Sequence, residues 1–278
     1  MTIQTSGASA MGVRAYGGTV TFADAASITT TGSAAHGLYL TTQSSAARLG
    51  TVNFNGAATI NVGSTSHGVL AEAGSGTFAG ASTTINANGT GDGVRVTGAA
   101  TGTGGLITFS GPSTIAAKGA GDGVRALAAS SRQGTVNFSA PSTIGSNTGY
   151  GVEVAGGLVN FTATPTIASA AKDAVLVSSG TLTTTAGANI GNLAAGAYAL
   201  HAATSGTLTG SGKFAVTGNL LAEGASTLTL SASGASVITG DATRTDTARF
   251  DIGLLETRNG QGRRPTSPTS PSIPASGP

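Results

Sequence analysis

Short runs in which apolar and polar residues alternate recur along most of this chain. A Gly-x-Val-x-Phe run is followed six or seven residues later by an isoleucine, and a Gly-Val-x-Val run begins seven to nine residues after that. Alternation with a period of two places the apolar side chains of a β-strand on one face and the polar ones on the other. Copies of the pattern span residues 18–40, 50–71, 78–96, 109–126, 138–154, 161–177 and 182–200, and the end of an earlier copy lies at 11–14. The pattern predicts a repeated set of short strands.

The spacing of the repeated isoleucines predicts a solenoid. These residues, at positions 28, 60, 85, 115, 144, 167 and 190, lie 32, 25, 30, 29, 23 and 23 residues apart. The shortest repeat cannot hold a strand, a helix and two loops, but it fits three short strands and three turns. Each repeat is therefore expected to form one coil of a right-handed, three-sided parallel β-helix of about 8–9 coils.

The same register predicts the core. Stacked coils place isoleucine above isoleucine and phenylalanine above phenylalanine, with about 4.8 Å between rungs. Ile85, Ile115 and Ile144 are expected in one buried column, and the phenylalanines at 22, 54, 78, 109, 138 and 161 in another. In the last copy Leu182 replaces phenylalanine, and the final strand is predicted at 197–200. Most variation in repeat length falls on one corner, at 41–49, 97–104 and 127–133, which are expected to be mobile and to contact any ligand.

Composition changes near the end of the repeats. Residues 1–240 are predicted to form the β-helix, whereas 241–264 carry nine charged residues and are expected to be a junction. The stretch 265–278 holds five of the eight prolines and is predicted to be a disordered tail. Residue 1 opens directly into what resembles the last part of a coil, so the repeat array is expected to begin upstream.

Charge and composition exclude several classes of protein. Charged residues make up 9% of the chain and the net charge is +2, with no basic cluster along the repeats, so nucleic acid is not an expected partner. There is no cysteine, no long apolar run and no charged-then-apolar segment at the N-terminus. As written, the chain shows neither a membrane span nor an export signal.

Two repeated surface positions are candidates for function. Asp92 and Asp122 occupy the same position in neighbouring coils, about 5 Å apart, as does Asp173 two coils further on. Paired carboxylates suit acid–base chemistry or calcium binding, but Asp-Gly is also a common turn dipeptide. The same position holds His36, His67 and Tyr150 in other coils, which favours the turn interpretation.

The second position lies three residues further along each coil. It holds Arg14, Tyr39, Arg95 and Arg125, with Leu70, Glu153 and Leu176 in the remaining coils. These residues are expected to form a surface ladder suited to polar ligands such as glycans. The alternative is a solvated strand face, on which Asp92–Arg95 and Asp122–Arg125 pairs contribute little.

Catalytic and metal-binding motifs are scarce. His36, His67 and His201 are too scattered for a zinc site, and no nucleophile elbow or phosphate loop precedes a helix. Asn53, Asn137 and Asn160 are expected to stack as a stabilising ladder. The sequence therefore predicts no catalytic residue, no metal and no cofactor.

The repeat resembles the passenger region of Gram-negative autotransporters, the pertactin-like adhesins. The resemblance rests on Gly-Thr-Val-Asn-Phe at 50–54 and 134–138, on the His-Gly segments at 36–40 and 67–70, and on the stretches 218–230 and 236–241. It covers about residues 1–241 and implies export, display at the cell surface, and adhesion. The chain as given resembles a fragment of such a protein, without the export signal and the C-terminal outer-membrane barrel.

Three functional hypotheses follow. The first is the β-helical stalk of a surface adhesin, not an enzyme, which contacts a host glycan or protein and which self-associates end to end if its strand edges are open. The second is a polysaccharide lyase or glycoside hydrolase on the same fold, favoured if three or more acidic residues converge in one groove. The third is a nonfunctional remnant of a truncated autotransporter gene.

Overall fold

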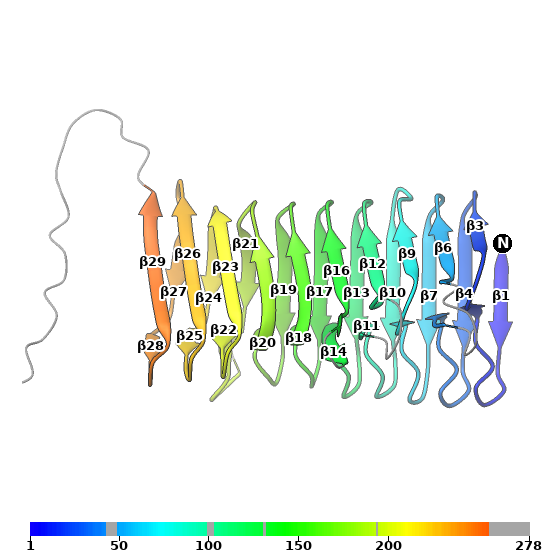
Figure 1. Cartoon of the computed structure of the whole chain (residues 1–278), viewed down its shortest axis with the longest axis horizontal. Helices are drawn as coiled ribbons and strands as arrows, with labels where there is room; N and C mark the ends of the chain where they lie inside the picture. Colours follow the sequence, from blue (N-terminus) through cyan, green and yellow to red (C-terminus); the bar gives the residue numbers. More distant parts are fainter. Residues whose placement is uncertain (43–48, 99–102, 130–131, 193, 256–278) are drawn as a thin grey trace, which may run out of the picture.

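The computed structural model describes residues 1–42, 49–98, 103–129, 132–192 and 194–255. Within these ranges the chain is all-β and contains no helix. The strands stand side by side along the long axis of the molecule, with β1 (Thr2–Thr5) at one end and β29 (Arg249–Leu255) at the other (Figure 1).

One row of strands, here called the isoleucine row, forms a sheet of its own. Its members pair in parallel, each with the strand one repeat further along the chain. They are β1, β4 (Ala26–Thr30), β7 (Ala58–Val62), β10 (Thr83–Ala87), β13 (Ser113–Ala117), β17 (Ser142–Ser146), β19 (Pro165–Ser169), β21 (Ala188–Gly191), β24 (Phe214–Thr217) and β27 (Val237–Thr239).

Two further rows are joined into a second, larger sheet. The valine row contains β2 (Val13–Ala15), β5 (Leu38–Leu40), β8 (Val69–Ala71), β11 (Val94–Val96), β14 (Val124–Ala129), β22 (Tyr198–Ala202), β25 (Asn219–Ala222) and β28 (Ala242–Arg244). The phenylalanine row contains β3 (Thr19–Phe22), β6 (Thr51–Phe54), β9 (Ser75–Phe78), β12 (Leu106–Phe109), β16 (Thr135–Phe138), β23 (Thr207–Gly212), β26 (Thr227–Ser233) and β29. β18 (Val152–Phe161) and β20 (Val175–Thr184) are long enough to belong to both rows.

The long strands explain the shortest repeats. In β18 and β20 no corner segment separates the Val run from the Phe run, so one strand continues around the corner with a shift in register. Gly156 and Gly180 lie at this bend with φ of 92° and 81°, in a region that residues with a Cβ avoid. The parallel pairing at repeat intervals is consistent with the predicted solenoid.

The predicted core columns are confirmed. Ile85 pairs with Ile115 and Ile115 with Ile144, and all three side chains are buried. The six phenylalanines at 22, 54, 78, 109, 138 and 161 stack with ring centroids 4.7 to 4.9 Å apart and nearly parallel planes. Burial of these aromatic and branched side chains is the main favourable contribution to folding.

The final repeat differs from its predicted register. Val175 pairs with Leu200 and Leu176 with His201, so the alignment with the preceding repeat is shifted by two residues from the predicted one, although β22 itself begins at Tyr198. The predicted register would have turned Tyr198 inward and placed its hydroxyl in an apolar core. Leu182 pairs with Val159, and it is Thr184 that follows Phe161 in the phenylalanine column.

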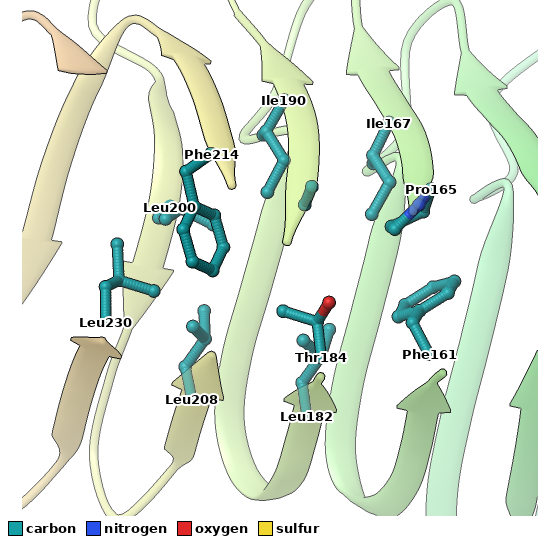
Figure 2. Close-up of a pocket in the computed structure, with 11 residues that line it drawn as sticks. Phe161, Pro165, Ile167, Leu182, Thr184, Ile190, Leu200, Leu208, Phe214 and Leu230 are labelled. Atoms are coloured by element: carbon teal, nitrogen blue, oxygen red, sulfur yellow. The ribbon is translucent and has the colours of Figure 1, made fainter. Parts of the chain in front are cut away.

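The phenylalanine column therefore changes character after Phe161. Thr184 and then Gly210 take the next two positions, and Leu230 the one after. A small apolar cavity of about 10 Å³ lies here, and Figure 2 shows Thr184 between the rings of Phe161 and Phe214. Phe214 comes from the isoleucine row, where it pairs with Ala188, so the aromatic ring has moved to the opposite wall of the core.

Strand pairing continues past the composition change at residue 240. β28 pairs in parallel with β25, and β29 with β26. The stacked strands thus extend to Leu255, while the predicted tail at 265–278 lies outside the described residues.

The corner segments are described only in part. Within 41–49, 97–104 and 127–133, residues 43–48, 99–102 and 130–131 lie outside the described ranges. Their flanks form short antiparallel contacts, between Thr42 and Leu49 and between β14 and β15 (Arg132–Gln133).

Candidate functional site

Two columns of side chains run next to each other along the valine row. The turn column lies just before the strands and contains Met11, His36, His67, Asp92, Asp122, Tyr150, Asp173 and Tyr198. The strand column lies three residues further on and contains Arg14, Tyr39, Leu70, Arg95, Arg125, Glu153, Leu176 and His201. The predicted alignment of repeats thus brings Asp92 next to Asp122, and Arg95 next to Arg125.

Side chains of the turn column accept hydrogen bonds from the backbone of the next repeat. The Asp122 N–H donates to Asp92 Oδ1 at 2.8 Å, and the Tyr150 N–H donates to Asp122 Oδ1 at 2.8 Å. In the same way the Asp92 N–H donates to His67 Nδ1 at 2.8 Å, and the His67 N–H donates to His36 Nδ1 at 3.0 Å. Each side chain thus satisfies a backbone donor that the turn would leave without a partner.

These hydrogen bonds limit the ability of Asp92 and Asp122 to bind a ligand or to take part in catalysis. Asp92 and Asp122 are 4% and 5% exposed, and in each one carboxylate oxygen is occupied by the backbone. Asp-Gly is therefore more than a turn dipeptide here, because the aspartate links successive repeats.

An open depression of about 370 Å³ lies over five successive repeats. It is lined by His67, Thr90, Asp92, Arg95, Ala120, Gly121, Asp122, Arg125, Tyr150, Glu153 and Lys172. Arg125 Nε lies 2.6 Å from Glu153 Oε2 and 3.7 Å from Asp122 Oδ2. The Arg125 N–H does not point at either oxygen, so the contact is an ion pair without a well-directed hydrogen bond.

Burial shifts the protonation of three groups that line the depression. Burial raises the pKa of Glu153 to about 7, helped by a hydrogen bond to Asp122 and opposed by Arg125. Burial also raises the pKa of Asp92 to about 6, although the hydrogen bond from the Asp122 N–H lowers it. Burial lowers the pKa of His67 to about 3, and the charges of His36 and Arg95 lower it further. At neutral pH His67 is therefore neutral, as its acceptor role requires.

The predicted surface ladder divides into two groups. Arg14 and Tyr39 lie near the start of the chain, where the Arg14 guanidinium is 5.5 Å from the Tyr39 ring centroid and 5.3 Å from that of Tyr16. The Tyr39 hydroxyl donates to Glu72 Oε2 at 2.6 Å. Leu70, 9% exposed, separates this group from Arg95, Arg125, Asp92 and Asp122, which line the depression.

A third polar cluster, around His201, was not anticipated from the sequence. His201 Nδ1 lies 2.8 Å from Asp173 Oδ2, and its Nε2 lies 3.1 Å from Glu223 Oε1. Burial lowers the pKa of His201, but the hydrogen bonds and charges of Asp173 and Glu223 outweigh this effect and raise it. Aligning Leu200 instead of Tyr198 with Val175 places His201 in the strand column. With that alignment the sequence could have located this cluster.

Lys172 and Thr90 are the other residues that sequence reasoning missed. Both precede turn-column residues, Lys172 by one position and Thr90 by two, so they reach the rim of the same depression. Of the predicted asparagine ladder, Asn160 donates to Asn137 at 2.9 Å, whereas Asn53 pairs with Thr77.

The depression and its neighbours contain no obvious metal site. Among the described residues no group of three His, Cys, Asp or Glu side chains is arranged to hold a metal ion. In the described part of the chain there is also no helix of the length and hydropathy that crossing a membrane requires.

Fold and site together define a class: an all-β protein of stacked parallel strands with a polar depression on one row. Comparisons with protein-family models, with curated proteins and with solved structures find no match for this chain.

Proposed function

We propose that this chain is the stalk of a surface adhesin, built as a right-handed, three-sided parallel β-helix of about 8–9 coils. The strong preference for right-handed crossovers between parallel strands supports the handedness. The proposed display at the cell surface, by export of a longer autotransporter-like protein, is supported by the resemblance of the repeats.

One observation carries the adhesive function: the open polar depression across five repeats of the valine row. It is shallow and formed by a rigid stack of strands, so it suits an extended ligand that lies along the surface. Its lining of arginine, lysine, tyrosine and threonine side chains suits the hydroxyl and charged groups of a glycan.

Adhesion is tested with beads that carry the purified chain. They are expected to bind cultured epithelial cells and to lose binding when surface glycans are removed enzymatically. Beads that carry the heat-denatured chain are the control. Equal binding by folded and denatured chain would overturn the adhesive function.

A second candidate, polysaccharide cleavage, is favoured by one specific observation. Asp92, Asp122 and Glu153 line the same depression, which meets the criterion of three converging acids, and the Glu153 pKa of about 7 suits a general acid. Against it, Arg125 pairs with both Glu153 and Asp122, and Asp92 is committed to the backbone.

Cleavage is tested with polygalacturonate and neutral glycans, with and without calcium. The adhesin hypothesis predicts no turnover by the wild-type chain. Turnover that disappears in Glu153→Gln but persists in Glu223→Gln, a variant outside the depression, would establish an enzyme instead.

A further inference from the structure

Two cations of the depression are left without a carboxylate partner. Arg125 is paired with Glu153 and Asp122, but within the described ranges no carboxylate lies within 4.0 Å of the charged groups of Arg95 or Lys172. Lys172 Nζ is held 4.5 Å from the ring centroid of Tyr150, so its ammonium has a defined place at one end of the depression.

The two cations lie in different repeats of the depression, far apart along the stack of strands. Arg95 pairs with Arg125, and Arg125 with Glu153, while Lys172 belongs to the repeat after Glu153. Three rungs separate Arg95 from Lys172, which corresponds to about 14 Å at the usual strand spacing. A ligand that reaches both cations must be longer than a single sugar ring.

The acids of the depression are not arranged for a metal cation. Arg125 already forms ion pairs with both Asp122 and Glu153, and one oxygen of Asp92 accepts the Asp122 N–H. The other oxygen, Asp92 Oδ2, is buried below the surface without a hydrogen-bond partner. A buried carboxylate oxygen that lacks a donor favours the protonated, uncharged carboxyl.

We propose that this depression binds an acidic oligosaccharide along the rod axis, with sugar carboxylates at Arg95 and Lys172 and sugar hydroxyls at Thr90 and Tyr150. The inference rests on the adhesive function proposed above and specifies the chemistry of its ligand. Arginine and lysine both recognise carboxylates, and the hydrogen-bonding side chains between Arg95 and Lys172 suit a polyhydroxylated chain.

The charge of the depression makes binding depend on pH. The groups that line it are Arg95, Arg125, Lys172, His67, Tyr150, Asp92, Asp122 and Glu153, and the charge of Asp173, outside the lining, also acts on Tyr150. Glu153 and Asp92 have raised pKa values of about 7 and about 6, so both become neutral as the pH falls from 7.5 to 5.5. Sugar carboxylates, with pKa values below about 4, stay charged in this range. Affinity is therefore expected to rise about three- to tenfold on acidification.

Isothermal titration calorimetry with trigalacturonate, and with the neutral galactose trimer as a comparison, tests the proposal. The wild-type chain is expected to bind the acidic trimer and not the neutral one, more tightly at pH 5.5 than at 7.5. Arg95→Gln/Lys172→Gln is expected to weaken binding about tenfold or more. Lys213→Gln/Arg244→Gln removes the same charge from exposed positions elsewhere and is expected to bind like wild type.

The outcomes separate this inference from the adhesive function. Equal affinity for the two trimers, or unchanged binding by Arg95→Gln/Lys172→Gln, overturns the acidic-sugar site while adhesion of the beads can still stand. Failure of both the titration and the bead assay overturns both proposals. Melting curves of each variant establish that a loss of binding does not reflect unfolding.

Discussion

At the scale of single residues, close packing explains the glycine that opens each Gly-Val-x-Val run. A Cβ added at Gly93 would lie within 3.0 Å of both Ile115 Cγ2 and the carbonyl oxygen of Gly123. The same clash with an isoleucine of the facing row occurs at Gly37, Gly68 and Gly123. None of these glycines has a positive φ, so the requirement is for space and not for an unusual backbone.

Gly93→Ala is therefore expected to destabilise the fold by about 1–3 kcal/mol, the usual cost of overpacking a dense core. Denaturant unfolding of the purified variant measures this change. Gly191→Ala is the matched control, because a Cβ there meets nothing within 4 Å. Equal stability of the two variants would contradict the packing explanation.

His67 predicts a pH dependence of stability. Its pKa is about 3 in the folded chain against 6.5 in the unfolded one, so the unfolded state takes up the proton first. The stability that neutral His67 contributes is fully present above pH 6.5 and is lost as the pH falls towards 3. By pH 5 the loss is expected to be about 1–2 kcal/mol.

The measurement is the difference in unfolding free energy between wild type and His67→Asn at pH 7.5 and at pH 5. The other groups that titrate in this range remain in both proteins, so the difference reports on His67 together with its contacts to Asp92 and His36. The advantage of wild type is expected to shrink at pH 5. An advantage that is constant or grows would show that His67 does not need to be neutral.

At the scale of strands, a change in side-chain size in one row is matched by an opposite change in the facing row. Gly210 takes a place in the phenylalanine column where a ring would otherwise stand, and a Cβ there would meet Phe214 Cζ at 2.6 Å. Phe214 in turn occupies a position that holds Ala26, Ala58 and Ala188 in other strands of the isoleucine row. A large residue on one wall is thus matched by a small residue on the other.

A double-mutant cycle tests this exchange. Phe214→Ala alone is expected to cost about 3–5 kcal/mol through the cavity that it leaves. Adding Gly210→Phe returns a ring to the same space, so the double variant is expected to be about 2 kcal/mol more stable than the sum of the single effects. Gly210→Phe combined with the distant Phe22→Ala is the control, and additivity in both pairs would contradict the compensation.

At the scale of the whole molecule, stability comes from contacts between neighbouring repeats. The described strands pair mostly with the strand one repeat away, and the buried columns run the length of the stack. The stability of one repeat can therefore depend on that of a distant repeat only through every repeat that lies between them.

Ile115→Asp is expected to interrupt this dependence. A carboxylate in the middle of the isoleucine column costs on the order of 5 kcal/mol, because it removes packing and buries an unpaired charge. Hydrogen exchange is expected to show loss of amide protection in the repeats on both sides of residue 115. Thr114→Asp, on the exposed face of the same strand, is the control and is expected to leave protection unchanged. Loss confined to the substituted strand would contradict coupling between repeats.

Much of this architecture could be predicted because strands that pair at repeat intervals bring equal positions of successive repeats into contact. The isoleucine and phenylalanine columns, and the adjacency of Asp92 with Asp122, follow from equal positions in successive repeats. The register of the last repeat was wrong where the period weakens, because alternation alone cannot decide which side of the strand Tyr198 takes. The contact between Phe214 and Gly210 could not be predicted from the pattern, since the two residues lie on different rows.

The sequence by itself determined the strands, the order of repeats and the residues that share a column, because local alternation and a constant period depend only on spacing along the chain. The tertiary structure alone decided which side chains meet between columns and between rows. Side-chain direction and burial decide the pairing of Arg125 with Glu153 and Asp122 and the contact of His201 with Glu223. They also decide that no carboxylate of the described residues pairs with Arg95 or Lys172. Such contacts are set by distances of a few ångströms in space, which residue spacing does not encode.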